Sequence, residues 1–145
     1  MKLKYTNQMN RFTTNIKVLK NHLDDLNHVN NVQYLYWAQD IAKSHWIFLT
    51  EDVKFPIGIW MVRHHDIIYR MGSFLGDIIK VSTYISNVKG PVLNRIVEFH
   101  NKDNDKLLVR ICTKWCYLNN LKDRKILSIP NNIIKLINPL DLKVK

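Results

Sequence analysis

The sequence contains few of the residues and segments that mark a membrane-spanning, secreted or multi-domain protein. Its 145 residues include only two cysteines, four glycines and four prolines, and no segment is rich enough in glycine, proline or serine to be a linker. No run of 18 or more apolar residues occurs, so no transmembrane helix is expected. The first residues lack the apolar stretch and the cleavage site of a secretory signal. We therefore expect one domain over residues 1–145, with a core at about 12–137, located in the cytoplasm without membrane insertion.

The two cysteines are too far apart to form a disulfide. Cys112 and Cys116 lie in a segment with the pattern of a β-strand. Four residues of a strand span roughly 13 Å at ~3.3 Å per residue, whereas a disulfide requires Cα atoms within about 7 Å of each other. Both cysteines are therefore expected to be free thiols, as in a reducing compartment.

Acidic residues are scarce, and the formal net charge is +10. Lysine, asparagine and isoleucine dominate with 16, 16 and 17 residues, whereas alanine occurs only twice. The codons of the three abundant residues are rich in A and T, so an A/T-biased genome produces a basic protein without selection for charge. The lysines form no block of five or six like charges, and no nucleic-acid-binding motif is recognisable. We therefore expect no nucleic-acid function, although a ligand with several phosphates would benefit from the positive field.

The N-terminal part predicts a strand, a polar loop and a long helix. Residues 12–20 alternate loosely and include β-branched side chains, which favours a strand. The polar segment 21–27 predicts a loop. A helix is expected over 31–50, because Asn30 is a good N-cap and Gln33 completes a pattern resembling a capping box.

The helix at 31–50 has an unusually broad apolar surface. Two stripes with spacings of three and four residues run along it: Val32, Leu35, Gln39, Ala42, Trp46 and Leu49, and Tyr34, Trp37, Ile41, His45 and Phe48. A helix that is apolar around most of its circumference must be buried. We therefore expect it to be almost wholly covered by a sheet that wraps around it.

The remainder of the sequence is rich in β-strand patterns. Strands are expected at 57–71, 78–88, 92–101 and 106–119, separated by turn residues, and a short helix is expected from about Pro130 to Ile137. The order is one strand, one buried helix and four antiparallel strands. This order predicts the α+β class.

Two motifs resemble those of hotdog-fold thioesterases related to 4-hydroxybenzoyl-CoA thioesterase. The first is the run from Asp24 to Leu35, which contains His-Val-Asn-Asn at 28–31, and the second is 63–69 followed by the turn 74–77. The similarity extends over about 12–135; His22, Asn27, Ile68 and Gly72 differ from the residues common in that family. The resemblance implies a single hotdog domain, in which a curved antiparallel sheet wraps around the helix at 31–50.

The same resemblance implies the chemistry and the residues of the site. Asp24 would be the catalytic carboxylate, acting as nucleophile or as general base on water. The backbone N–H of Asn31, at the positive end of the helix, would polarise the thioester carbonyl. His28, Asn30 and His65 are further candidate substrate-binding residues. His64 and His65 should point to opposite faces of their strand. No metal is expected, and no cofactor beyond the coenzyme A of the substrate.

The expected reaction is hydrolysis of an acyl-CoA to a carboxylic acid and coenzyme A. The family resemblance implies a homodimer or homotetramer with active sites between subunits, and the strand at 57–71 is expected at a dimer contact. One alternative is a thioesterase acting on acyl carrier protein. Another is a non-catalytic module that binds acyl-CoA or lipid, although an aspartate in an intact motif disfavours it.

Overall fold

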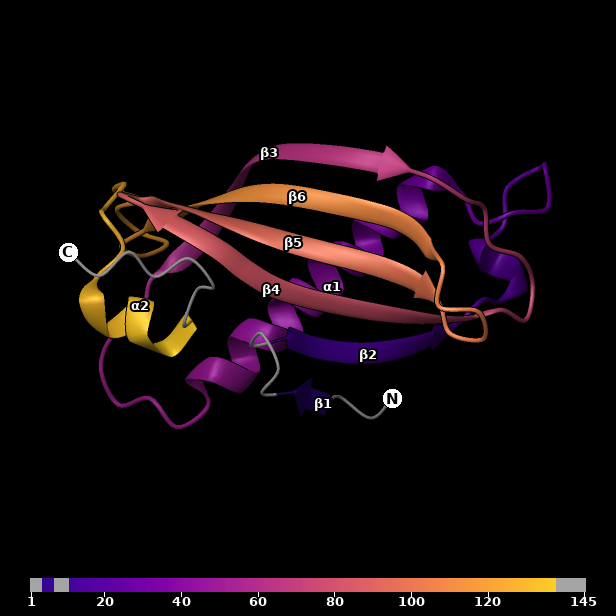
Figure 1. Ribbon diagram of the computed structural model, residues 1–145. Coiled ribbons are helices and arrows are strands. Elements are labelled where there is room, and N and C mark those ends of the chain that lie inside the picture. Colours follow the sequence, from indigo (N-terminus) through magenta and orange to yellow (C-terminus); the bar gives the residue numbers. More distant parts are fainter. Residues whose placement is uncertain (1–3, 7–10, 138–145) are drawn as a thin grey trace.

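The computed structural model describes residues 4–6 and 11–137. Its elements in chain order are β1 (Lys4–Thr6), β2 (Arg11–Lys17), a short 3-10 helix (Lys20–His22), α1 (Asn31–Thr50), β3 (Ile59–Tyr69), β4 (Ile78–Lys89), β5 (Val92–Asn101), β6 (Leu107–Leu118) and α2 (Asn131–Ile137). The strands form one antiparallel sheet in the order β1-β2-β4-β5-β6-β3. Figure 1 shows this sheet curving over α1, with α2 at one end of the sheet.

The predicted α+β class and the predicted hotdog architecture are confirmed. The five predicted strands, the central helix and the terminal helix all occur, and α1 has the predicted bounds of 31–50. The strand β1 was not predicted. It is only three residues long and exists by pairing with β2, and three residues are too few to show a period of two.

The start of α1 is formed by a side-chain cap. Asn30 Oδ1 accepts a hydrogen bond from the backbone N–H of Val32 at 2.9 Å, as expected of an N-cap. The second half of the expected capping box is not formed, because the backbone N–H of Asn30 donates instead to the carbonyl of His22 at 3.0 Å. The polar loop, rather than Gln33, therefore satisfies this donor and joins the loop to the helix.

One face of α1 lies against the sheet and the other is open. The face toward the sheet buries Tyr34, Trp37, Ala38, Ile41, Ala42 and His45. The expectation that α1 is almost wholly buried is wrong, since Tyr36 and Ile47 are 60% and 59% exposed. The apolar pattern is continuous around the helix, but one curved sheet covers only the side that it touches.

Two smaller expectations can be checked on the strands. Cys112 and Cys116 are both free thiols, as predicted. His64 is exposed whereas His65 is partly buried, and His65 pairs with Thr113 of β6, so the two histidines do point to opposite faces. None of the described helices combines the length and the apolar composition needed to span a membrane.

Candidate active site

A compact loop connects β2 to α1 and carries most of the predicted site residues. Leu23 and Val29 pair across this loop, the N–H of Asp24 donates to the carbonyl of His28, and the N–H of Asn27 donates to the carbonyl of Asp24. Asn27 closes the turn with φ at +59°. Asparagine tolerates this left-handed conformation, as glycine does. Asn27 can therefore form this turn without a glycine at its position.

A second turn holds the loop against the sheet. The N–H of Val29 donates to the carbonyl of Ser73 at 2.9 Å, and His28 pairs with Phe74. Within that turn Gly76 has φ at +85°, and the Asp77 carboxylate accepts from the N–H of Phe74 at 2.9 Å. Gly76 and Asp77 therefore shape the turn that pairs with His28.

The carboxylate of Asp24 is held by only one of its two oxygens. Oδ1 accepts a hydrogen bond from the N–H of Leu26 at 2.9 Å, which fixes the side chain. Oδ2 lies 3.8 Å from Nε2 of His28. The side chain of Asp24 is 26% exposed, so the carboxylate is partly accessible to solvent. Asp25, by contrast, is exposed.

The first turn of α1 offers an unused hydrogen-bond donor. The N–H of Val32 is capped by the Asn30 side chain, and the N–H of Gln33 donates to the Asn30 carbonyl at 2.9 Å. Among the residues that the structure describes, nothing accepts from the N–H of Asn31. This group lies at the positive end of the helix dipole, where a developing negative charge is stabilised.

A small cavity of about 180 Å³ opens beside the first turn of α1. His28, Asn31, Tyr34 and Tyr69 line it, together with backbone near Gly72. The phenol of Tyr69 donates to the carbonyl of Asn31 at 3.0 Å. Burial raises the pKa of both tyrosines, so both phenols are uncharged at neutral pH. Asp24 does not itself line this cavity, and His28 lies between the two.

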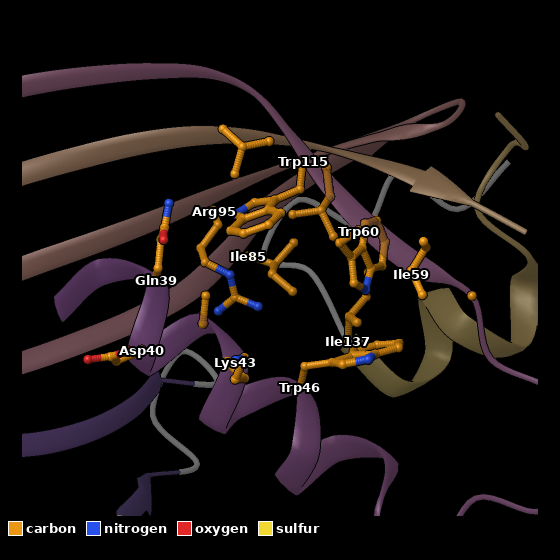
Figure 2. Close-up of a pocket in the computed structure, with 14 residues that line it drawn as sticks. Gln39, Asp40, Lys43, Trp46, Ile59, Trp60, Ile85, Arg95, Trp115 and Ile137 are labelled. Atoms are coloured by element: carbon orange, nitrogen blue, oxygen red, sulfur yellow. The ribbon is translucent and has the colours of Figure 1, made fainter. Parts of the chain in front are cut away.

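A larger cavity of about 450 Å³ lies under the second half of α1. Figure 2 shows Trp46, Trp60 and Trp115 around this cavity, with Arg95 next to Trp115; it is called the tryptophan cavity below. Arg95 is only 5% exposed, and its Nη1 lies 2.9 Å from Nδ1 of His45 and 3.0 Å from Oγ1 of Thr83. Both atoms act as acceptors, because arginine has only donors.

Burial determines whether Arg95 and His45 are charged. Burial lowers the pKa of Arg95 to about 10, which leaves the guanidinium charged at neutral pH. Burial, and to a smaller extent the charge of Arg95, lowers the pKa of His45 to about 3, so this imidazole is uncharged. An uncharged His45 can accept at Nδ1 from Arg95.

Comparison with known proteins identifies the family. The sequence matches the family model of the acyl-ACP thioesterase N-terminal domain over residues 9–137. The chain belongs to this thioesterase family. A thioester hydrolase, the class of enzyme predicted from the motifs, is therefore confirmed at the level of the family. No curated protein matches the sequence significantly.

Solved structures of thioesterases share the fold. YbaW, a probable thioesterase from Escherichia coli, is 19% identical with a TM-score of 0.74, over 86% of this chain and 94% of that one. A 1,4-dihydroxy-2-naphthoyl-CoA thioesterase from Synechocystis is 20% identical with a TM-score of 0.73, over 93% and 99% of the two chains. A mutant 4-hydroxybenzoyl-CoA thioesterase in complex with 4-hydroxybenzoyl-CoA is 14% identical with a TM-score of 0.76, over 88% and 98%. At these identities the likeness establishes the hotdog fold.

The thioesterase chain brings four of the five predicted site residues together. Asp24 and His28 lie in the loop that precedes α1, and Asn30 and Asn31 lie at the start of the helix itself. His65 lies apart, in the middle of β3, with its Nδ1 2.8 Å from Oγ1 of Thr113. Burial, and then the neighbouring His64, lowers the pKa of His65. Within one chain, His65 therefore does not line the cavity beside Asn31.

Three residues around the two cavities were not predicted from the sequence. Tyr34 and Tyr69 lie within the two motifs that suggested the thioesterase fold, so their positions in the sequence could have indicated that they lie near the site. Nothing in the sequence indicated that Arg95 lines a cavity, because a single arginine in a strand pattern does not show how deeply it is buried or which residues it contacts. No group of three or more histidine, cysteine or acidic side chains with metal-binding geometry occurs in the described part of the chain.

Proposed function

We propose that this chain hydrolyses acyl-CoA thioesters, with Asp24 as the catalytic carboxylate and the Asn31 N–H as the oxyanion donor. One observation carries the proposal: the loop that holds Asp24, with Oδ2 in contact only with His28 at 3.8 Å among the described residues, leads directly into a helix whose first N–H has no acceptor in the same part of the chain. Acyl transfer requires a nucleophile or general base and a donor for the developing oxyanion, and this segment supplies both groups.

The chemistry follows from the thioester carbonyl. Either Oδ2 of Asp24 attacks the carbonyl carbon and forms an anhydride that water then cleaves, or Asp24 removes a proton from an attacking water. In both routes the C–S bond breaks, the thiolate leaves and takes up a proton, and the acid is released. The Asn31 N–H stabilises the oxygen that becomes negative in the transition state. Tyr69 holds the first turn by its bond to the Asn31 carbonyl.

The substrate class rests on two further considerations. One structure that shares the fold is a complex with 4-hydroxybenzoyl-CoA, and the +10 net charge of this chain favours a ligand with several phosphates. Acyl carrier protein is the second candidate donor, because the matching family is that of acyl-ACP thioesterases. A carrier protein with an acidic surface would also benefit from the positive field.

Assembly into a homodimer through β3 is part of this proposal. β3 is 11 residues long and, among the strands that the structure describes, pairs only with β6, so within this part of the chain its outer edge presents unpaired backbone groups. Long free edges of this kind are templates for a second strand. Antiparallel pairing about the middle of β3 would place the Tyr69 end of one copy beside the Ile59 end of the other. His65 would then lie near the symmetry axis, and the candidate site of one copy would face the tryptophan cavity of the other.

A thiol-release assay tests the proposal. Acyl-CoAs of several chain lengths and an aromatic acyl-CoA should release free thiol, and acyl-pantetheines of the same acyl groups should react much more slowly if the nucleotide is bound. Equal rates on both series would favour the carrier-protein donor. Absence of thiol release from acyl-CoA, acyl-pantetheine and acyl carrier protein would contradict hydrolysis and favour the binding module.

A further inference from the structure

Arg95 has more hydrogen-bond donors than the protein satisfies. A guanidinium has five N–H groups. The bonds of Arg95 within the described residues both come from Nη1, to His45 and Thr83. Its Nε and Nη2 have no acceptor there, and no described carboxylate forms an ion pair with it. The side chain lines the tryptophan cavity, and in Figure 2 its guanidinium extends into this space.

A buried charge without a counter-ion is costly to keep. Burying an ion removes its hydration, and this loss is recovered only by close partners of opposite charge or by a full set of hydrogen bonds. His45 and Thr83 are both uncharged acceptors. A residue of this kind is therefore expected to be retained for a ligand that supplies the missing charge.

The walls of the cavity divide into a polar end and an apolar end. Figure 2 shows Gln39 and Lys43 on the same side as Arg95, whereas Trp46, Trp60 and Ile137 lie at the other side. The carboxylate of Asp40 points away from Arg95 in this view, and no ion pair joins these two residues in the described part of the chain. The indole N–H of Trp115, which also belongs to the lining, has no acceptor in the described residues. This arrangement fits an amphipathic anion.

We propose that the tryptophan cavity is a binding site for a medium-chain carboxylic acid, with its carboxylate on Arg95 and its hydrocarbon chain between Trp46 and Trp60. The volume is suitable. A cavity of about 450 Å³ holds about 15 non-hydrogen atoms at the ~30 Å³ that a water molecule occupies in the liquid. A carboxylate would accept two parallel N–H bonds from the guanidinium, which is the strongest arrangement for this pair. Decanoate falls within this size.

The carboxylate has two possible sources. It is either a free acid, such as the product of the proposed hydrolysis, or the far end of an acyl group that carries a second carboxylate. Both place the same group on Arg95. Binding of a free acid can be measured without turnover, so this inference and the proposed hydrolysis can fail separately.

Equilibrium binding to the intact protein tests the site, with calorimetry and the fluorescence of the lining tryptophans as readouts. Decanoate should bind at least about tenfold more tightly than decanamide, because a bond between two charged groups is considerably stronger than its neutral counterpart. This comparison uses the unaltered chain and does not depend on any variant folding. Equal affinities for the acid and the amide, or binding of neither, would overturn the proposal.

Variants then locate the carboxylate. Arg95→Met fills a similar volume without charge, and it should lose the preference for decanoate while still binding decanamide. The same change at Arg110, a partly exposed arginine 3.6 Å from Glu98 on the other face of the sheet, is the matched control and should keep the preference. Unchanged decanoate binding by Arg95→Met would refute the assignment. Arg95→Lys should retain part of the preference, since it keeps the charge but loses the two-pronged geometry.

Kinetics separate the two sources of the carboxylate. If the natural ligand is a free acid, decanoate should inhibit hydrolysis by the unaltered protein and inhibit Arg95→Met at least about tenfold less. If it is the far end of the substrate, Arg95→Met should lower kcat/KM at least about tenfold for an acyl-CoA ending in a carboxylate and leave its methyl-ended counterpart unchanged. If the protein hydrolyses acyl-CoA but shows neither of these two effects, a role of the site in the reaction is refuted.

Discussion

His45 should make the stability of this protein sensitive to mild acid. The imidazole is 2% exposed, stacks on Phe12 with ring centroids 5.0 Å apart, and lies 2.9 Å from Nη1 of Arg95. Protonating it in place would put two positive charges in contact. Burial, with the charge of Arg95 as the smaller cause, lowers the pKa of His45 from 6.5 to about 3 in the folded state.

The sign and the size of the effect follow from proton linkage. Between pH 7 and 5 the unfolded chain takes up a proton on this histidine, whereas the folded chain does not, so stability falls as the pH falls. With one pKa unit equal to about 1.4 kcal/mol, His45 by itself lowers the free energy of unfolding by about 2 kcal/mol over this range. The loss of stability would continue toward pH 3, where His45 of the folded state begins to bind a proton as well.

Urea unfolding at pH 7 and pH 5 measures this loss. In His45→Gln the amide oxygen still accepts from Arg95 but does not titrate, so this variant should lose about 2 kcal/mol less than the unaltered protein between the two pH values. His64→Gln, which removes an exposed histidine of β3, should follow the unaltered protein. Parallel pH dependence of His45→Gln and the unaltered protein would show that His45 is not held uncharged by burial, and the reasoning would fail.

Three further outcomes are expected. Asp24→Asn should lower kcat for thioester hydrolysis by at least about 10²-fold with KM little changed, because the amide keeps the Leu26 contact but removes the reacting charge. The control Asp25→Asn should lower kcat less than about tenfold. Equal losses of kcat in the two variants would show that the register of the motif is wrong. Gly58→Ala should destabilise the fold by about 1–3 kcal/mol in urea titrations, because its Cβ would collide with the carbonyl of Leu118, and unchanged stability would contradict this close approach. Sedimentation should give a mass of at least a dimer, and a strict monomer would exclude a site shared between subunits.

The sequence was sufficient for features that depend on neighbours along the chain. The helix at 31–50 was predicted with its correct bounds because Asn30 caps it and its apolar stripes have helical spacing. The polar loop that carries Asp24 and the start of the helix at Asn31 could also be predicted, because both depend on residues that are close in the sequence. The same local logic failed for β1, which is too short to show a pattern and depends on its partner strand.

Tertiary structure alone decided which face of α1 is covered and where Arg95 lies. An apolar period records which side chains avoid water but not how far one sheet extends, so the exposure of Val32, a member of one apolar stripe that is 52% exposed, could not be predicted. Arg95 is placed opposite Thr113 by strand register, and His45 is brought to it by a helix 50 residues earlier in the chain. Alternation along one strand does not specify such partners, because register and packing bring together residues that no local pattern connects. The buried cation of this thioesterase fold is therefore a property of the folded chain.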